Sequence, residues 1–374
     1  MNTIHVNIPP SAATHYDIHI GSDLITQLGE RVKPLAPAPS CGLITDSNVA
    51  KLYLQKARQS LASAGYRVIE HIIPAGEQSK NIQNATAALD TLLHARVERS
   101  TPIIALGGGV VGDLAGFVAA TLLRGVPFVQ VPTTLLAAVD ASVGGKVGID
   151  HAAGKNLIGA FHQPQIVITD ISSFASLPSL EIRGGLAECI KHAVIRDASL
   201  FAFIAANLPK IIAADSAVMQ ELVARNVAIK AAIVEEDPFE HGVRALLNFG
   251  HTFAHAIENV LNYGISHGYA VAAGMTAAAR LAHKLGRFPH NDLCELLTLL
   301  DAAELPTCCL NIDVDKVLAA MWTDKKVKSG QIRLILPSKI GHAEVVTGVS
   351  EAHLRQAIES LLQPTLAEKR QENP

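Results

Sequence analysis

The first half of the chain alternates short runs of β-branched and aliphatic residues with longer amphipathic segments. Each short run is bounded by Gly, Pro, Ser or Asp, which is typical of buried strands. We predict strands over 41–46, 66–73, 101–107, 127–132 and 165–170, and helices over 48–64, 79–96 and 113–123. Strands and helices that alternate in this way predict an α/β domain with a parallel, Rossmann-like sheet covered by helices on its faces.

The pattern changes near residues 172–180, where Ser, Phe and Pro interrupt it. Beyond this point, Ala- and Leu-rich segments with helical periodicity predict helices over 179–196, 199–213, 216–234, 245–260 and 268–285, and 331–337 with 342–348 reads as a late hairpin. We therefore expect an α/β domain over 1–176, a mainly α-helical domain over 177–362 and a polar tail over 363–374.

Composition narrows the functional classes. With 49% hydrophobic residues and a net charge of −3, the chain of 374 residues is not a disordered one. The balance of 31 basic and 34 acidic residues, with only 4% aromatics, argues against nucleic acid as a partner. The N-terminus lacks the basic segment followed by an apolar segment that is typical of a signal peptide. The charge-free run 125–139 is too short to cross a bilayer, and the five cysteines show no CxxC spacing. These features predict a cytoplasmic protein with no membrane partner.

A glycine-rich motif follows the strand predicted over 101–107. Gly107, Gly109 and Gly112 satisfy GxGxxG, which lets backbone N–H groups approach a phosphate at a helix N-terminus. The acidic residue that usually follows about 20 positions later is missing, so the motif is not the standard dinucleotide fingerprint. A turn required only for close strand–helix packing is the alternative.

Three further features favour a nucleotide over a packing turn. AGEQSK (75–80) and PTT (132–134) follow predicted strand ends, where ligands of open α/β sheets bind, and Asp46 could accept a hydrogen bond from a ribose hydroxyl. Neither Lys146 nor Lys155 completes a GxxxxGK[ST] loop, so a P-loop is unsupported.

The glycine-rich stretch 139–156 lies between two strand patterns and carries Asp140, Lys146, Lys155 and Asn156. Lysines on such a loop are usually solvated surface charges. Two lysines that each follow a glycine, together with an asparagine, are more typical of an anion site.

Possible metal ligands occur in the helical half. Glu188 and Lys191 lie one helical turn apart, either as a surface ion pair or as polar groups in an apolar setting that need a partner or a metal. His251 and His255 share a helical face, and His267 follows across a short connection. Such histidines are often satisfied core residues, but one Glu and two His also form a catalytic zinc site. Spacing does not decide which histidines are the ligands.

Further cationic and amide side chains accompany these residues. Arg244 and Asn248 are one turn apart, and Lys230, Arg124 and Lys325 add positive charge beyond what a nucleotide needs. The residues predict a nucleotide-dependent, metal-assisted enzyme that acts on a small, doubly anionic substrate.

Several long motifs, in order along the chain, closely resemble the 3-dehydroquinate synthase family of sugar phosphate cyclases. They are GGGVVGD (107–113), RGVPFVQVPTTLLAAVDASVGGK (124–146), GKNLIGAFHQP (154–164), GLAECIKH (185–192), RALLNFGHTFAHAIE (244–258) and DKKV with IRLILP (324–337). The resemblance implies an NAD- and metal-dependent lyase of the shikimate pathway, active as a homodimer, with its site in the cleft between the domains. That family converts 3-deoxy-D-arabino-heptulosonate 7-phosphate to 3-dehydroquinate and phosphate, by transient oxidation, elimination, re-reduction and aldol closure.

The resemblance also implies residue roles. The implied ligands of one divalent metal, zinc or cobalt, are Glu188, His251 and His267. The implied catalytic residues are Lys146, Lys191, His255, Glu240 and Asp140. The implied substrate contacts are Arg124 from the second subunit, Asn156, Lys230, Arg244, Asn248 and Lys325. Of these, Lys230 and Arg244 suit a carboxylate, and Asn156, Asn248 and Lys325 suit a phosphate. The implied NAD contacts are Asp46, Asn48, Glu77, Lys80, Gly109, Val110, Val111, Gly112, Asp113, Thr133, Thr134, Lys146, Lys155, Ser173, Phe174, Ala175 and Ser176.

The sequence departs from the family pattern at a few positions. HGYAV has Tyr269 where the family usually has Glu, two residues from the implied ligand His267, which bears on how the metal is tuned. The other departures are Val147, His192, Phe239 and Ala254. The alternatives are a sibling cyclase that makes an inosose or valiolone, a metal-dependent polyol dehydrogenase, and a non-catalytic α/β scaffold. The presence of Lys230, Arg244 and Asn248 favours a carboxylated substrate, and hence dehydroquinate synthase, over the sibling cyclases.

Overall fold

The five predicted strands are present and form one sheet together with a strand near the N-terminus. The structure is a computed structural model that describes residues 15–240, 242–308, 311–323, 327–328 and 331–362. The sheet has the order β1-β8-β5-β4-β2-β3 and its paired strands are all parallel. Its strands are β1 (Asp17–Gly21), β2 (Ser40–Asp46), β3 (Arg67–Ile73), β4 (Ile103–Gly107), β5 (Phe128–Pro132) and β8 (Ile166–Asp170). The α/β prediction is confirmed.

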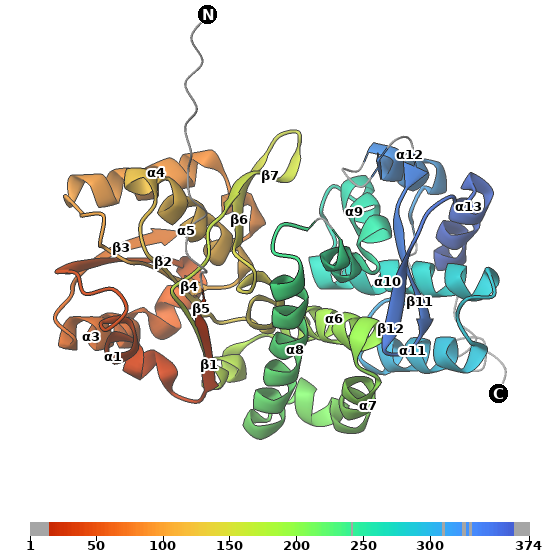
Figure 1. The fold of residues 1–374 in the computed structure, drawn as a ribbon, viewed down its shortest axis with the longest axis horizontal. Coiled ribbons are helices and arrows are strands. Elements are labelled where there is room, and N and C mark those ends of the chain that lie inside the picture. Colours follow the sequence, from red (N-terminus) through yellow and green to blue (C-terminus); the bar gives the residue numbers. More distant parts are fainter. Residues whose placement is uncertain (1–14, 241, 309–310, 324–326, 329–330, 363–374) are drawn as a thin grey trace, which may run out of the picture.

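Helices cover both faces of this sheet (Figure 1). Successive residues of a strand point to opposite faces, so Leu43 and Ile104 join one buried cluster while Ile44 and Ile103 join the other. The first cluster packs under α1 (Leu28–Val32) and α3 (Gln55–Ser63), and the second packs under α4 (Ile82–His94) and α5 (Gly109–Thr121). Shorter helical segments in this half are η1 (Leu24–Gln27), α2 (Ser47–Val49), η2 (Ala50–Leu54), η3 (Glu77–Ser79), η4 (Leu122–Arg124), η5 (Ala137–Ala141) and η6 (Ile171–Ser176).

The stretch expected to be a glycine-rich loop is instead a hairpin of β6 (Lys146–His151) and β7 (Gly154–Phe161). The hairpin lies between the sheet and the helical half (Figure 1). Gly148 and Gly159 face each other across it, and a Cβ on either would meet the opposite backbone at 2.6 or 2.2 Å. Gly148, one of the glycines that suggested a loop, therefore serves close pairing of two strands.

The second half is mainly helical, as predicted. Its elements are α6 (Ser179–Arg196), α7 (Ala198–Ile212), α8 (Ser216–Glu236), η7 (Val243–Asn248), α9 (His251–Val260), α10 (His267–Lys284), α11 (His290–Ala302), α12 (Val314–Thr323), α13 (Glu351–Glu359), η8 (Ser360–Leu362) and the pairs β9 (Val327–Lys328) with β10 (Gln331–Ile332) and β11 (Leu334–Lys339) with β12 (His342–Val346). The late hairpin is confirmed, whereas α11, α12 and α13 were not predicted.

Two of the helix boundaries that differ from the prediction bear on the site. The single helix expected over 245–260 is wrong, because the chain turns at Gly250, whose φ is 79°, and α9 begins only at His251. The helix expected over 113–123 begins earlier, at Gly109, so the glycine motif itself forms its first turn.

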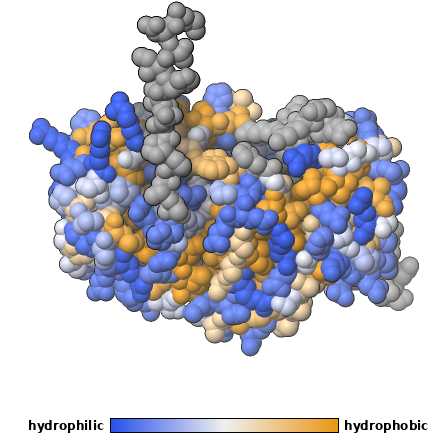
Figure 2. Space-filling model, in the orientation of Figure 1, coloured by the Kyte–Doolittle hydropathy of each residue, from blue (hydrophilic) through white to orange (hydrophobic). Residues whose placement is uncertain are grey.

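On the face shown in Figure 2, hydrophilic residues lie mainly around the edge. Hydrophobic residues are visible at several places nearer the middle. No helix within the described residues combines the length and apolar character needed to cross a membrane.

Candidate functional site

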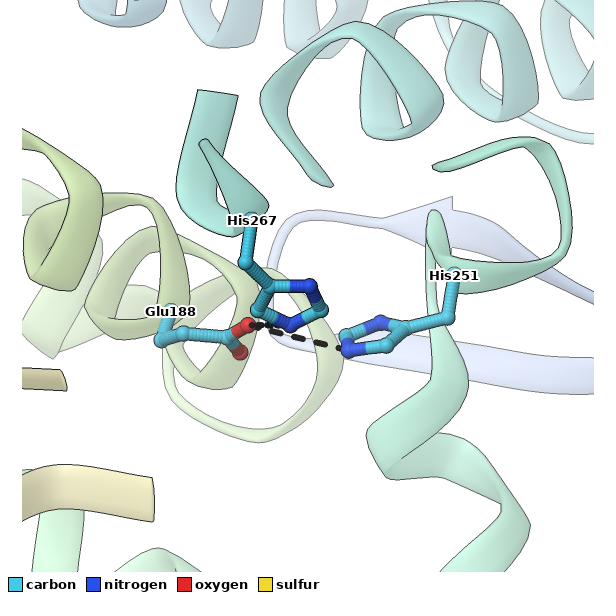
Figure 3. A group of neighbouring side chains, drawn as sticks. All are labelled: Glu188, His251 and His267. Carbon is cyan, nitrogen blue, oxygen red and sulfur yellow. Dashed lines mark ion pairs between the residues drawn. The ribbon is translucent and has the colours of Figure 1, made fainter. Parts of the chain in front are cut away.

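Three side chains from three different helices converge in the helical half. Glu188 comes from the middle of α6, and His251 and His267 are the first residues of α9 and α10. They point toward one another (Figure 3), and Oε1 of Glu188 lies 3.6 Å from Nε2 of His251 and 3.4 Å from Nε2 of His267. One potential ligand atom from each residue lies within 4.8 Å of the other two.

Glycines permit this convergence. A Cβ on Gly268 would lie 2.1 Å from the carbonyl oxygen of Gly184, so the start of α10 rests directly on α6. A Cβ on Gly274 would lie 2.1 Å from the carbonyl oxygen of Gly250, so α10 also rests on the start of α9. Both contacts bring backbones closer than any side chain would allow, which places the three potential ligands together.

The donor set fits a divalent cation. Glu188 is fully buried, and neither of its carboxylate oxygens has a hydrogen-bond partner of good geometry among the described residues. Lys191 pairs with Oε2 of Glu188, while Oε1 faces the two histidines, and Glu with two His is a donor set that zinc uses with one position left open. Burial by itself lowers the pKa of His267, but Glu188 and Glu258 together raise it to about 10.

His255 is a neighbour of this group. Its half-buried ring lies 5.5 Å from that of His251 and 6.4 Å from that of His267, measured between centroids. Because ligand atoms of Glu188, His251 and His267 lie within 4.8 Å of one another, the geometry favours His251 and His267 as ligands, a choice that sequence spacing leaves open.

A buried charge cluster adjoins the potential ligands. Nζ of Lys230 donates to Oδ1 of Asp140 at 2.6 Å, and Nζ of Lys191 lies 3.9 Å from the same oxygen and pairs with Glu188. Burial raises the pKa of Asp140, but Lys230 and Lys191 outweigh it and hold that pKa well below its usual range. Burial lowers the pKa of Lys230. The nearby carboxylate of Asp140 raises it by less, so the pKa of Lys230 is lowered overall.

His192 belongs to the same cluster and was not among the predicted site residues. The amide nitrogen of Asn226 donates to the carbonyl oxygen of Leu222, so the amide oxygen faces Nδ1 of His192 at 3.2 Å. Nδ1 therefore carries the proton, and the buried Nε2 has no hydrogen-bond partner among the described residues. Burial, with Lys191, lowers the pKa of His192 to about 3, so the imidazole is neutral.

Glu240 connects two predicted site residues, Lys146 and Asn248. Its carboxylate pairs with Lys146 and accepts a hydrogen bond of 2.9 Å from Nδ2 of Asn248. Arg244 is buried nearby and donates to the carbonyl oxygens of Pro238 and of Gly144, the latter at 3.1 Å. These predicted residues therefore lie together at the junction of the hairpin and η7.

Several predicted nucleotide residues gather at the carboxyl edge of the sheet, whereas Lys146 and Lys155 lie on the hairpin and pair with Glu240 and Glu258. The strand order reverses between β2 and β4, and such a switch point is where open α/β sheets bind ligands. Asp46 ends β2, where its Oδ1 caps α2 by accepting from the N–H groups of Asn48 and Val49, and Gly109 begins α5 after β4. The buried Oγ1 of Thr133 has no hydrogen-bond partner among the described residues, which fits a site that a ligand completes.

Lys80 is the centre of a second ion cluster at this edge. Its buried ammonium lies 2.8 Å from Glu77, 3.3 Å from Asp113 and 3.7 Å from Asp150, a residue that was not predicted. Burial would lower the pKa of Lys80, but Asp113 and Glu77 raise it. Burial raises the pKa of Asp113 to about 6 although Lys80 opposes this.

The turn at Ser173–Ser176 is anchored to η2. The hydroxyl of Tyr53 lies 2.7 Å from Oγ of Ser176 and donates to the carbonyl oxygen of Ser173 at 3.1 Å. The side chain of Phe174 is buried in the core, so a ligand at this turn would meet Ser176, the backbone or the exposed Ala175.

Three predicted substrate residues are not in the cluster. Arg124 is exposed and precedes β5, so it lies at the amino edge of the sheet, opposite the carboxyl edge. Asn156 is exposed on β7, with its backbone N–H bonded to Asp150. Lys325 lies outside the described residues.

Sequence reasoning missed Glu258, which lies 3.4 Å from Nδ1 of His267. A signal was present, because His251, His255 and Glu258 follow at helical spacing and share one face of α9. Tyr269 is partly buried against the helical core, with Arg183 and Glu304 as its electrostatic neighbours.

Both the sequence and the structure of this chain are similar to those of known enzymes. The sequence models described as 3-dehydroquinate synthase N-terminal and C-terminal match residues 70–184 and 185–327. A 3-dehydroquinate synthase of Nitrosospira multiformis is 45% identical over 96% of this chain and 98% of its own length. The structure is similar to the 2-epi-5-epi-valiolone synthase of Streptomyces hygroscopicus subsp. jinggangensis with NAD+ and Zn2+ bound, with a TM-score of 0.88 and 26% identity over 97% of this chain and all of the other. It is also similar to a 2-deoxy-scyllo-inosose synthase complexed with carbaglucose-6-phosphate, NAD+ and Co2+, with a TM-score of 0.84 and 25% identity over 91% of this chain and 95% of the other.

Proposed function

The chain belongs to the 3-dehydroquinate synthase family, and we propose how its own residues divide the work of that activity. It is a carbon–oxygen lyase that requires NAD and a divalent metal and eliminates phosphate from a sugar phosphate. The substrate is 3-deoxy-D-arabino-heptulosonate 7-phosphate and the products are 3-dehydroquinate and phosphate. The observation that carries the assignment of residues is the Glu188–His251–His267 group beside the buried Asp140–Lys191–Lys230 cluster.

Glu188, His251 and His267 are the proposed metal ligands. When bound, the metal polarises substrate oxygens and NAD accepts and returns a hydride. Lys191, paired with Glu188 and close to Asp140, holds positive charge where substrate oxygen becomes negative. His255, half-buried beside the ligands, is placed to exchange a proton with the substrate.

The remaining residues bind and orient the substrate. Lys230 and Arg244 are proposed to hold the carboxylate, and Asn156, Asn248 and Lys325 the phosphate. In this structure Asp140 pairs with Lys230, and Glu240 pairs with Lys146. Both carboxylates are proposed to hold substrate hydroxyls, and Glu240 is also proposed to hold Lys146 in place. The two anionic groups of the substrate would compete with these carboxylates for their cationic partners. The cationic side chains would then pair with the bound substrate.

NAD is proposed to lie across the carboxyl edge, with its pyrophosphate at the N-terminus of α5. Gly109 to Asp113 supply the first turn of that helix, where free N–H groups attract phosphate. The other proposed contacts are Asp46, Asn48, Glu77, Lys80, Thr133, Thr134, Lys146, Lys155 and the turn Ser173–Ser176.

The position of Arg124 supports a homodimer. The residue is exposed at the amino edge of the sheet, away from the proposed site of its own chain, so we propose that it completes the site of a second copy. A location in the cytoplasm, with neither nucleic acid nor membrane as a partner, is part of the same proposal. The cysteines without CxxC spacing favour the cytoplasm, the net charge of −3 and the scarcity of aromatic residues argue against nucleic acid, and the charge-free run 125–139 is too short to span a membrane.

The test uses purified protein with NAD, zinc and the heptulosonate phosphate. Phosphate should be released without accumulation of NADH, and a heptulose phosphate that lacks the carboxylate should be a poor substrate. NADH that builds up with turnover would indicate a polyol dehydrogenase, and a preference for the substrate without a carboxylate would indicate a sibling cyclase. H267A should lose bound zinc while H290A, at an exposed histidine of α11, retains it.

A further inference from the structure

The buried carboxylate of Glu258 contacts the proposed metal ligand His267 on the side away from Glu188. Nε2 of His267 lies 3.4 Å from Glu188, while its Nδ1 lies 3.4 Å from Oε1 of Glu258. The two nitrogens are on opposite parts of the ring, and only one is directed toward Glu188 (Figure 3). The side chain of Glu258 is only 3% exposed, so its carboxylate is buried against this partly exposed histidine.

The tautomer of His267 follows from this arrangement. A neutral imidazole that binds a metal through Nε2 carries its proton on Nδ1, and metal-binding histidines usually donate that proton to a carboxylate, a carbonyl oxygen or water. Oε1 of Glu258 is the acceptor in reach. The other proposed histidine ligand follows the same rule, because Nδ1 of His251 lies 3.1 Å from the carbonyl oxygen of Phe249. The two ligands differ in that only His267 has a charged acceptor.

A second contact keeps Glu258 in place. Nζ of Lys155, on β7, donates to the same Oε1 at 3.2 Å and lies over the ring of Tyr263. Glu258 therefore joins α10, which carries the ligand, to the hairpin, which carries a proposed NAD contact.

We propose that Glu258 is a positioning residue that holds His267 as the Nδ1–H tautomer and aims its Nε2 at the metal. The inference rests on the proposed metal site. It also assigns this role to α9 rather than to position 269, whose side chain in this chain is a tyrosine near Arg183 and Glu304. A carboxylate behind a histidine ligand raises its basicity and fixes its orientation, which strengthens metal binding.

The experiment measures zinc affinity by competition with a chromophoric chelator, and the visible spectrum of the cobalt-loaded protein. E258L removes the acceptor and should weaken zinc binding by about 10- to 100-fold. E258Q keeps an amide oxygen but no charge, so it should weaken binding less and shift the cobalt bands. Y269F, on the same helix as His267, is the matched control and should match wild type in both measurements.

The outcomes separate the two proposals. If wild type itself binds no zinc, the metal site is overturned and the role of Glu258 with it. If wild type binds zinc and both Glu258 variants match it in affinity and cobalt spectrum, only the role of Glu258 is overturned. If E258L does not fold, as judged by circular dichroism, E258Q decides alone, because it preserves the volume of the side chain.

Discussion

Replacing Gly268 by alanine should separate two of the proposed metal ligands. A Cβ at this position would lie 2.1 Å from the carbonyl oxygen of Gly184, whereas real Cβ contacts stay beyond 3.0 Å, so α10 must move from α6 by about 1 Å. The distance of 3.4 Å between His267 and Glu188 would grow by a similar amount, more than the roughly 0.5 Å that a functional site tolerates.

The same contact offers its own control. A Cβ on Gly184 meets nothing within 4 Å, so G184A changes the other partner of this glycine pair without a clash. Alanine is also the better helix former by about 0.5–1 kcal/mol, so G184A should equal or slightly exceed wild type in stability. G268A should lower the free energy of unfolding by about 1–3 kcal/mol, the usual cost of overpacking.

Two assays check this reasoning. Urea unfolding of the metal-free proteins gives the free energies, and chelator competition gives the zinc affinity. G268A should be destabilised and bind zinc more weakly, and G184A should be unaffected in zinc affinity. The reasoning is refuted if G268A equals G184A in both quantities, since the close approach of α10 to α6 would then have no role in forming the site.

Three more outcomes follow from the site. Removing the metal with a chelator should abolish activity, and zinc or cobalt should restore it in a phosphate-release assay; activity that survives complete chelation would contradict the metal assignment. His192 has a folded pKa of about 3, below the usual 6.5, so below pH 6.5 only the unfolded chain gains a proton there and stability is lost as the pH falls. Between pH 7 and 5 this loss is about 2 kcal/mol, and H192Q should reduce the measured fall in unfolding free energy by that amount; an equal fall in both proteins would refute the assignment. D140N leaves Lys191 and Lys230 buried without their shared carboxylate and should destabilise the protein by about 3–5 kcal/mol, with partial recovery in D140N/K230M; additive effects of the two changes in unfolding experiments would contradict the coupling.

The strands β2, β4, β5 and β8 were predictable because each one is buried on both faces, whereas β3 at the edge of the sheet is partly exposed. Runs such as 41–46 and 165–170 each contain consecutive apolar residues with turn-forming residues close by, a pattern that local sequence reveals directly. The hairpin of β6 and β7 was not, because it is rich in glycine and β7 is largely exposed, so it resembles a loop. The break before α9 was also hidden, since the apolar spacing continues through it and only the positive φ of Gly250 marks the turn.

Local spacing also revealed part of the site. His251 and His255 share a face of one helix, and Glu188 with Lys191 share a turn of another, so these neighbours were visible in sequence. The same spacing would have pointed to Glu258. The family motifs added roles to these residues but no distances between them.

The sequence by itself determined the kind of protein and the chemical groups it uses: an α/β half, a helical half, and an inventory of carboxylates, imidazoles and cations. Only the tertiary structure decided which of them meet. Glu188 and His267 face each other because Gly268 lets α10 rest on the backbone of α6, and His192 is neutral because packing buries it beside Asn226. Contacts between distant segments depend on how helices approach one another and on burial, and neither quantity is encoded in spacing along the chain.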